Sequence, residues 1–149
     1  MKYATSITAI DASPEVIAIN KLKVQSKKVK YIKLDLFKWK LTTRFDVVFF
    51  SFWLSHVPEE LFHKFWSMVR SALKPKGRVF FIDNLKSEGH GGNVYDLKNQ
   101  TGVRTLKDGR SYKIVKIFYE PKKLKARLHK SGWNIEVDNT KNYFLYGYG

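Results

Sequence analysis

The hydrophobic residues of this 149-residue chain fall into short apolar blocks that alternate with segments of helical spacing. The most apolar block is Phe45–Ser51, and Phe52, Trp53 and His56 follow it closely. This run of large β-branched and aromatic residues is too short for a whole helix, and it predicts a strand covered on both faces, as in a parallel sheet. We therefore expect Phe45–Ser51 to be the central strand.

The N-terminal segment predicts a strand followed by a helix. Residues 6–11 form a short β-branched run that ends in an acid. Ser13 and Pro14 are then typical of a helix N-cap and of the first helical position. Three apolar residues at helical spacing are expected to form the buried stripe of this helix. They are Val16, Ile19 and Leu22.

The alternation of strands and helices continues as far as residue 83. Residues 29–34 alternate with period two and predict a strand with one wetter face. Residues 58–73 carry apolar side chains at helical spacing, and this helix is expected to stop at residues 74–77. Residues 78–83 form another apolar strand. This succession predicts parallel βαβ units with right-handed crossovers.

The next part of the chain is less regular. Residues 84–109 are polar and glycine-rich, and we expect a plain loop or lid there, with residues 89–92 as its most flexible part. Glycines can cradle a phosphate, but the strand and helix of a phosphate-binding loop do not flank these. Residues 112–119 alternate like a strand or an extended arm. Residues 121–130 predict a basic amphipathic helix.

Two closing strands are predicted at the C-terminus. Residues 133–140 and 143–148 are close enough in sequence to form an antiparallel hairpin at one end of the sheet. No internal repeat and no linker divides the sequence. We therefore expect residues 1–149 to form a single domain.

Composition excludes several classes of site and partner. The chain has no cysteine, which excludes disulfides, thiolate metal sites and a cysteine nucleophile. His56 and His63 lack a clustered third ligand, so no metal site is expected. No apolar run approaches the ~20 residues of a membrane span and no signal peptide is recognisable, so we expect a cytoplasmic protein with no membrane partner.

The net charge of +15 raises the question of nucleic acid as a partner. Most of the 28 basic residues are lysines, and they are spread along the chain without an arginine-rich cluster or a nucleic-acid-binding motif. A solvated, lysine-rich surface is the favoured interpretation.

Four segments, in this order and spacing, resemble the class I S-adenosylmethionine-dependent methyltransferases. They are Thr8-Ala9-Ile10-Asp11-Ala12-Ser13-Pro14, Leu34-Asp35-Leu36, Phe45-Asp46-Val47-Val48 and Leu73-Lys74-Pro75-Lys76-Gly77-Arg78. The resemblance extends from about residue 5 to the end and is closest to the small-molecule branch of the family. It implies S-adenosylmethionine as cofactor and an α/β fold with a doubly wound, mostly parallel Rossmann-like sheet and an antiparallel C-terminal hairpin.

The resemblance implies cofactor-binding roles for residues that follow the first two strands. Asp11 would accept hydrogen bonds from both ribose hydroxyls, which requires an ionised carboxylate, and Ala12 would lie along the adenosine. Asp35 and Leu36 would bind the adenine. The alternative for Asp11 and Asp35 is that each caps a helix or forms a turn. For Asp83, a role in the wall of the cleft and a role as a cap are equally favoured.

The resemblance implies further roles after the central strand. Ser51 and Phe52 would line the methionine side of the cofactor, and Trp53, His56 and Tyr143 would face the acceptor. Positioning alone can supply roughly 7 to 11 kcal/mol of the acceleration in an in-line methyl transfer. A general base is needed only for a hydroxyl or protonated amine acceptor. His56 is the candidate catalytic residue, with a structural or cleft-shaping role as the alternative.

One departure from the family concerns the N-terminus. The family's first strand and glycine-rich loop should precede residue 7 by about thirty residues, the length of one βαβ unit. We therefore expect a shortened version of a longer protein, with the first strand missing. Alternatively, residues 7–10 pair directly with residues 47–50, or a second copy supplies a strand in a homodimer or strand-swapped assembly.

Three functional hypotheses follow. The first is methyl transfer to a small-molecule acceptor. The second is a non-catalytic, methyltransferase-like binding or partner subunit that holds the cofactor poorly without the glycine loop. The third is an RNA methyltransferase, which predicts a nucleic-acid affinity that falls steeply with salt. The acceptor itself, and the oligomeric state, are not specified by the sequence.

Overall fold

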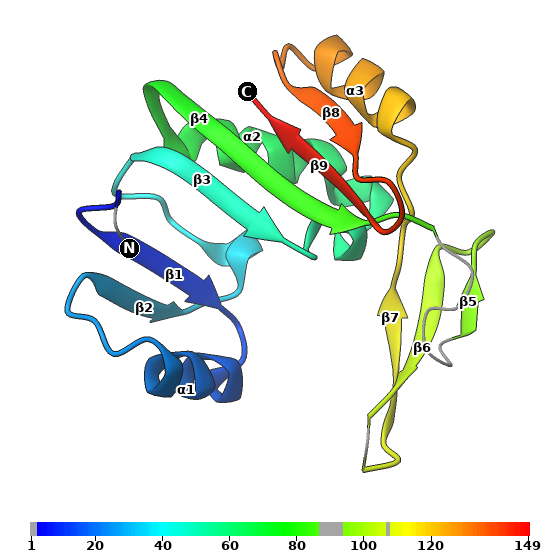
Figure 1. Cartoon of the computed structure of the whole chain (residues 1–149), viewed down its shortest axis with the longest axis horizontal. Helices are drawn as coiled ribbons and strands as arrows, with labels where there is room; N and C mark the ends of the chain where they lie inside the picture. Colours follow the sequence, from blue (N-terminus) through cyan, green and yellow to red (C-terminus); the bar gives the residue numbers. More distant parts are fainter. Residues whose placement is uncertain (1–2, 87–93, 107) are drawn as a thin grey trace. The chain divides into compact units, whose positions relative to one another are not determined.

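The chain divides into two compact units, Met1–Thr42 and Thr43–Gly149. A computed structural model describes residues 3–86, 94–106 and 108–149 (Figure 1). The first unit contains four elements: strand β1 (Ile7–Asp11), helix α1 (Pro14–Lys23), strand β2 (Val29–Lys33) and the 3-10 turn η1 (Leu36–Lys38). β1 and β2 pair in parallel, which confirms the strand–helix–strand order expected from the sequence.

Helix α1 begins where the sequence predicts, but it buries a different face. Ser13 has an extended backbone, and its Oγ accepts a hydrogen bond from the Val16 amide at 3.2 Å, as a helix N-cap does. The buried residue is Ile17. Val16, Ile19 and Leu22 are exposed, so the predicted stripe is wrong. Apolar residues occur on several sides of this short helix, and their spacing therefore does not determine which side packs.

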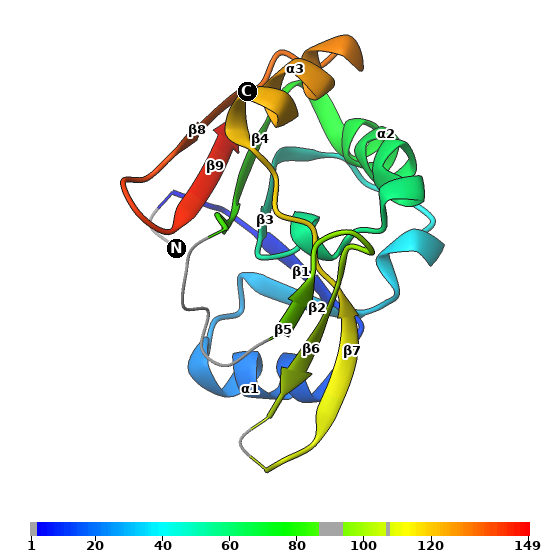
Figure 2. The same ribbon diagram turned by 90° about the vertical axis from the view of Figure 1, so that its right-hand side faces the viewer.

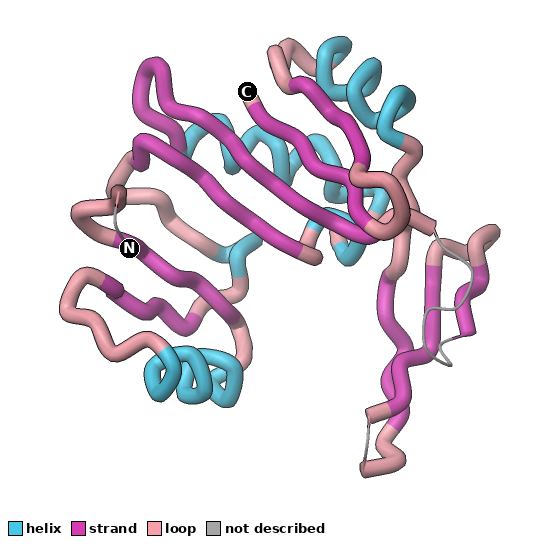
Figure 3. The backbone as a smooth tube through the Cα atoms, in the orientation of Figure 1, coloured by secondary structure: helices cyan, strands magenta, loops and turns pink. Residues whose placement is uncertain are grey.

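The second unit is built on a mixed four-stranded sheet in the order β3-β4-β9-β8 (Figure 3). β3 (Phe45–Ser51) and β4 (Leu73–Asn84) are parallel. β9 (Phe144–Tyr148) runs antiparallel to both β4 and β8 (Glu136–Asn139). The predicted antiparallel C-terminal hairpin is therefore confirmed, and the chain has an α/β fold with a mixed sheet.

Strand β3 is an edge strand and not the expected central one. Among the described residues it pairs with β4 alone, and residues 7–10 pair with β2 in the first unit. Its faces differ, because Val47 is 57% exposed and Phe49 58% exposed. The expectation of two covered faces is therefore wrong. An unbroken apolar run indicates a strand, but it does not say how many strands or layers lie beside it.

The segment after β3 contains the 3-10 turns η2 (Leu54–His56) and η3 (Glu59–Leu61) and then helix α2 (Phe62–Ala72). The predicted helix thus starts later than Pro58. Helix α2 ends at Ala72, just before residues 74–77, so the predicted stop is confirmed, although these residues belong to β4, which begins at Leu73. Pro75 cannot continue a helix, so the chain turns into the strand directly, and the β3–β4 register is irregular there.

The core lies between the sheet and two helices, α2 and α3 (Pro121–Lys130), which pack along the same face (Figure 2). Phe50 of β3 meets Phe65 of α2 edge to face, with ring centroids 5.1 Å apart. Trp66 meets Phe81 of β4 in the same way at 5.7 Å. Each fully buried side chain of this size contributes roughly 1.5 to 3 kcal/mol. The helix α3 was predicted with these bounds, and its buried residues are Leu124 and Leu128.

The segment expected to be a loop contributes two strands to a three-stranded antiparallel sheet, and the third strand lies in the stretch predicted as a strand or extended arm. The strands of this sheet are β5 (Val94–Asp96), β6 (Thr101–Thr105) and β7 (Ser111–Val115), in that order. The loop expectation is therefore wrong for residues 94–105, while residues 89–92 lie outside the described residues. Short strands with polar turns leave little apolar pattern to detect. Within the described ranges, no helix has the length and apolarity needed to cross a membrane.

Candidate functional site

Two acids lie at the carboxyl ends of the parallel strands of the first unit. Asp11 is the last residue of β1, and its Oδ1 accepts the Ser13 amide at 2.8 Å. Asp35 follows β2, and its Oδ1 accepts the Phe37 amide at 3.0 Å. Its Oδ2 lies 3.7 Å from the Lys38 ammonium. Each acid therefore makes the turn or cap contact that the sequence left open as an alternative.

These contacts leave acceptor capacity on Asp11. An ionised carboxylate offers about four lone-pair sites, and only Oδ1 of Asp11 accepts a hydrogen bond among the described residues. Ala12 follows it and is exposed. Leu36 begins η1 and is half-buried. The arrangement fits a ligand that presents a pair of hydroxyls to Asp11.

The second unit makes a sharp turn immediately after β3. Phe52 has a φ of +52°, a left-handed conformation that is unusual for a bulky residue and costs roughly 1 to 2 kcal/mol. Its amide donates to the Ile82 carbonyl at 2.8 Å, which holds the turn against β4. Its ring meets that of Phe144 at 5.8 Å. Ser51, Phe52 and Trp53 are all exposed at this carboxyl end of the strand.

A buried carboxylate joins this turn to the end of β4. Asp83 is 1% exposed, and its Oδ2 accepts the Ser55 amide at 2.8 Å. Its Oδ1 accepts the Asn84 amide at 2.8 Å. The contacts of Asp83 are thus those of a capping residue, and they fix the position of η2.

Lys116, just after β7, completes a buried polar cluster. Its Nζ donates to Ser55 Oγ at 2.9 Å and to Asn84 Oδ1 at 3.2 Å, and it lies 3.8 Å from Asp83 Oδ1. Burial lowers the pKa of Lys116, while the Asp83 carboxylate opposes that change. Sequence reasoning missed this residue. The available signal was a single lysine between Val115 and Ile117 in an otherwise apolar stretch.

The imidazole of His56 has a defined tautomer. Its Nδ1 lies 2.7 Å from the Val115 carbonyl oxygen. Because a carbonyl only accepts, Nδ1 carries the proton and Nε2 is the free acceptor of the neutral ring. Burial lowers the pKa of His56 from 6.5, the Val115 hydrogen bond opposes this, and the Lys116 charge lowers it further. The lowered pKa favours the neutral ring, whose Nε2 can accept a hydrogen bond. No group of three or more potential metal ligands occurs among the described residues.

The residues expected to face the acceptor all belong to the second unit. Tyr143 precedes Phe144, the residue that Phe52 contacts, and its carbonyl accepts the Leu85 amide at 2.8 Å. Trp53 and His56 lie on the same short segment as Phe52. Of the predicted cofactor-binding residues, Ser51 and Phe52 also belong to the second unit, and the other four belong to the first. They are Asp11, Ala12, Asp35 and Leu36.

Comparison with known proteins identifies relatives of the chain. Residues 1–77 match a family described as "Methyltransferase domain". The solved structure of a DhpI-SAM-HEP complex is 38% identical with a TM-score of 0.83, and the match covers 97% of this chain and 68% of that one. A DhpI-SAH complex is 39% identical with a TM-score of 0.81, and the match covers 96% of this chain and 64% of that one. No curated protein matches the chain.

A more distant structure shares the fold. It is an S-adenosylmethionine dependent methyltransferase from Mesorhizobium loti, 18% identical with a TM-score of 0.68, and the match covers 97% of this chain and 80% of that one. The family match extends over more than half of the sequence, and the DhpI-SAM-HEP structure is related at 38% identity over nearly all of it. The chain belongs to the class I S-adenosylmethionine-dependent methyltransferases.

Proposed function

We propose that this chain takes part in methyl transfer from S-adenosylmethionine to a small-molecule acceptor, on a doubly wound Rossmann-like sheet. The observation that carries the proposal is the identity of 38–39% with DhpI structures whose names include SAM and SAH. The match covers nearly all of this chain but only 64–68% of the DhpI chains. A glycopeptide N-methyltransferase, MtfA, has a similar fold at 15% identity.

The resemblance to the family implies cofactor-binding roles for the following residues. Asp11 offers the unused Oδ2 and the remaining lone pairs of Oδ1 to the ribose hydroxyls, beside the exposed Ala12. Asp35 and Leu36 would contact the adenine. Ser51 and Phe52 would lie along the methionine. When bound, S-adenosylmethionine supplies a methyl group already activated by its sulfonium.

The acceptor would lie against Trp53, His56 and Tyr143. His56 Nε2 is the proton acceptor if the acceptor reacts through a hydroxyl, because Nδ1 donates to Val115. The Asp83 and Lys116 contacts hold Ser55, the neighbour of His56, in place. This support matters because methyl transfer depends mainly on the relative position of the reacting groups.

Calorimetric titration with S-adenosylhomocysteine tests the proposal. We expect binding by the wild-type chain and a loss of about 10- to 100-fold in Asp11→Asn, the effect of losing a charge-assisted hydrogen bond. The asparagine oxygen can still accept the Ser13 amide, so the turn is preserved. Asp46→Asn is the matched control, because Asp46 is an exposed acid paired with Lys74.

The outcomes separate the three functional hypotheses. A folded chain that does not bind S-adenosylhomocysteine would contradict the proposal and favour a non-catalytic partner subunit. Binding that Asp11→Asn leaves unchanged would contradict the role of Asp11. Nucleic-acid binding that weakens steeply with salt would favour an RNA methyltransferase.

A further inference from the structure

Arg104 of β6 lies on the same face of the three-stranded sheet as Lys116. In the antiparallel ladder Gly102 is opposite Ile114, and Arg104 follows Gly102 by two positions. Paired residues share a face, and so do residues two positions apart along a strand. The Lys116 amide donates to the Gln100 carbonyl at 2.8 Å, so the ladder continues one residue beyond β7. Arg104 and Lys116 therefore lie on one face, separated by the pair Gly102–Ile114.

The backbone of β7 brings this part of the sheet next to His56. The Val115 carbonyl accepts the hydrogen bond from His56 Nδ1 at 2.7 Å, and η2 is thereby attached to β7. Burial is the main cause that lowers the pKa of His56 and of Lys116, and the charge of Arg104 lowers both pKa values further. Because salt screens exposed charges beyond about 10 Å, the Arg104 guanidinium lies close to both groups.

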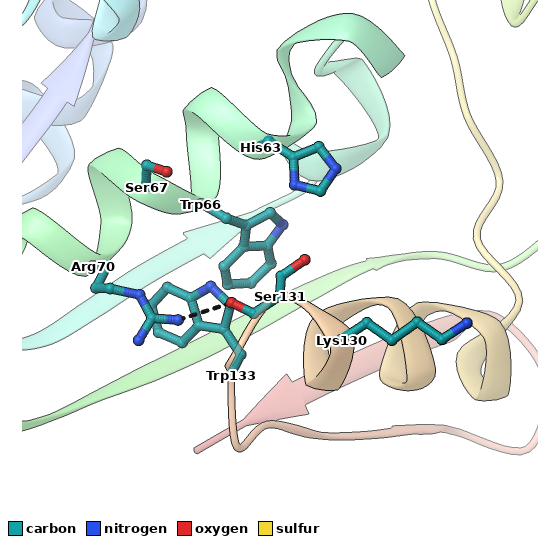
Figure 4. Close-up of a pocket in the computed structure, with 7 residues that line it drawn as sticks. All are labelled: His63, Trp66, Ser67, Arg70, Lys130, Ser131 and Trp133. Carbon is teal, nitrogen blue, oxygen red and sulfur yellow. Dashed lines mark hydrogen bonds between the residues drawn. The ribbon is translucent and has the colours of Figure 1, made fainter.

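The side chain of Arg104 is available to a ligand. It is exposed, and it makes no ion pair or hydrogen bond with the residues that the structure describes. Other arginines of the second unit are already engaged. The Arg70 guanidinium lies 4.3 Å from the centre of the Trp133 ring (Figure 4), and Arg110 pairs with Asp108. The five N–H donors of the Arg104 guanidinium therefore remain for a bound molecule.

The charges around His56 leave one positive charge without a counter-charge. The charged groups that act on the imidazole are those of Lys116, Asp83 and Arg104. Lys116 and Asp83 form the buried pair described above, so their charges offset each other. Arg104 has no such partner among the described residues. A carboxylate or phosphoryl group would balance its charge, and a guanidinium can bind such a group through two parallel hydrogen bonds.

We propose that the methyl acceptor is an anion, and that its carboxylate or phosphoryl group binds to Arg104 beside His56. This inference rests on the proposed function, which assigns the acceptor to Trp53, His56 and Tyr143. Arg104 then determines specificity, because a neutral acceptor of the same shape would leave its charge unbalanced. Lys116 holds Ser55 and supplies no direct contact, since its ammonium is already bound by Ser55 and Asn84.

The pKa of His56 tests the position of Arg104 without any ligand. It is measured on the whole chain from the ring C–H signals in ¹H–¹³C NMR, and the His56 signal is the one absent in His56→Asn. Arg104→Gln should raise the pKa of His56, because it removes a nearby positive charge. Lys113→Gln is the matched control and should leave the pKa unchanged, since Lys113 is opposite Val103 and lies on the other face of the hairpin. An unchanged pKa in Arg104→Gln would overturn the proposal.

Titration with small anions tests the ligand class. Acetate and inorganic phosphate are added to the chain with S-adenosylhomocysteine present, at constant pH and ionic strength. We expect at least one of them to shift the His56 signal saturably, with a Kd of about 1 mM or tighter. Arg104→Gln should weaken this binding about tenfold, as for the loss of a charge-assisted hydrogen bond, and Lys113→Gln should not. The anion that binds more tightly distinguishes a carboxylate from a phosphoryl acceptor, and acetamide, which lacks the charge of acetate, should bind more weakly than acetate.

Calorimetry with S-adenosylhomocysteine separates the possible failures. A chain that binds S-adenosylhomocysteine but shows no shift of the His56 signal with either anion would overturn the anionic acceptor and leave the proposed function intact. A chain that binds an anion but not S-adenosylhomocysteine would contradict the proposed function, and with it the acceptor role of the anion. Equal weakening in Arg104→Gln and Lys113→Gln would indicate general attraction to a basic surface and would also overturn the proposal.

Discussion

The ammonium of Lys116 lies 3.8 Å from Oδ1 of Asp83, and both side chains are almost fully buried. Asp83 is near the end of β4, and Lys116 follows β7, so the pair links the four-stranded sheet to the strand that leaves the three-stranded sheet. Both residues also bind Ser55: Asp83 accepts a hydrogen bond from the Ser55 amide, and Lys116 donates one to the Ser55 hydroxyl. The cluster therefore holds the segment that carries His56.

Removing one member of this pair should be strongly destabilising. We expect Lys116→Met or Asp83→Asn to lower the free energy of unfolding by about 3 to 5 kcal/mol, because the remaining charge is buried without its partner. The double variant should lose less than the sum of the two single losses, since it leaves no buried charge. Urea denaturation measures all four proteins. Additive losses would show that the two side chains act independently.

The stability of the folded chain should depend on the protonation of His56. Its pKa in the folded state lies below 6.5, mainly because the ring is buried. As the pH falls, the unfolded chain therefore takes up a proton on His56 before the folded chain does. The stability that depends on a neutral His56 is fully present above pH 6.5, and it is lost as the pH falls through the folded pKa.

His56→Asn isolates this effect. We expect wild type to lose more unfolding free energy than the variant between about pH 7.5 and about pH 5.5, values on either side of the ordinary histidine pKa. The other histidines are present in both proteins and serve as the internal control. Equal losses in urea denaturation would contradict the prediction.

Gly147 of β9 has no room for a side chain. A Cβ there would lie 2.3 Å from the ring of Phe81, its register partner on β4. Phe81 cannot move easily, because it stacks on Phe50 with centroids 5.3 Å apart. We expect Gly147→Ala to cost about 1 to 3 kcal/mol of unfolding free energy in thermal or urea denaturation. In a Phe81→Leu background the same substitution should cost less, and an unchanged cost would point to backbone strain.

Ser13 should control the start of α1 in the first unit. Ser13→Ala removes the acceptor of the Val16 amide and should destabilise the helix by about 0.5 to 2 kcal/mol. Amide hydrogen exchange at Val16 and Ile17 should become faster, while exchange in α2 should stay the same. Ser13→Asp retains an acceptor and should restore most of the protection. Unchanged exchange at Val16 in Ser13→Ala would contradict the prediction.

Much of the fold follows from local patterns in the sequence. The Ser13–Pro14 start of α1, the bounds of α3 and the C-terminal hairpin are all set by neighbouring residues, and they were predicted correctly. The edge position of β3 was not predicted, because the number of neighbours of a strand depends on the rest of the chain. The face that α1 buries was also missed. Ile17 and Val16 are both apolar, and the sequence does not show which of the two faces the rest of the unit.

The site could be predicted only in part. Asp11 occurs in a segment that resembles a known family, and Phe52 follows closely after another such segment, so the resemblance locates both residues without any knowledge of contacts. Lys116 belongs to no such segment, and its importance comes from Ser55 and Asp83, which are 61 and 33 positions away in the sequence. A buried lysine of this kind can be recognised only when its partners are known.

The position of β3 has a consequence for handling the protein. In the four-stranded sheet, β3 pairs on one side only, with β4, and Val47 and Phe49 are exposed on one of its faces. A bare edge rich in such residues is a template on which another extended chain can add, including one from a second molecule. Concentrated samples should therefore tend to aggregate through this strand. Val47→Lys, which places a positive charge on the strand, should reduce this aggregation.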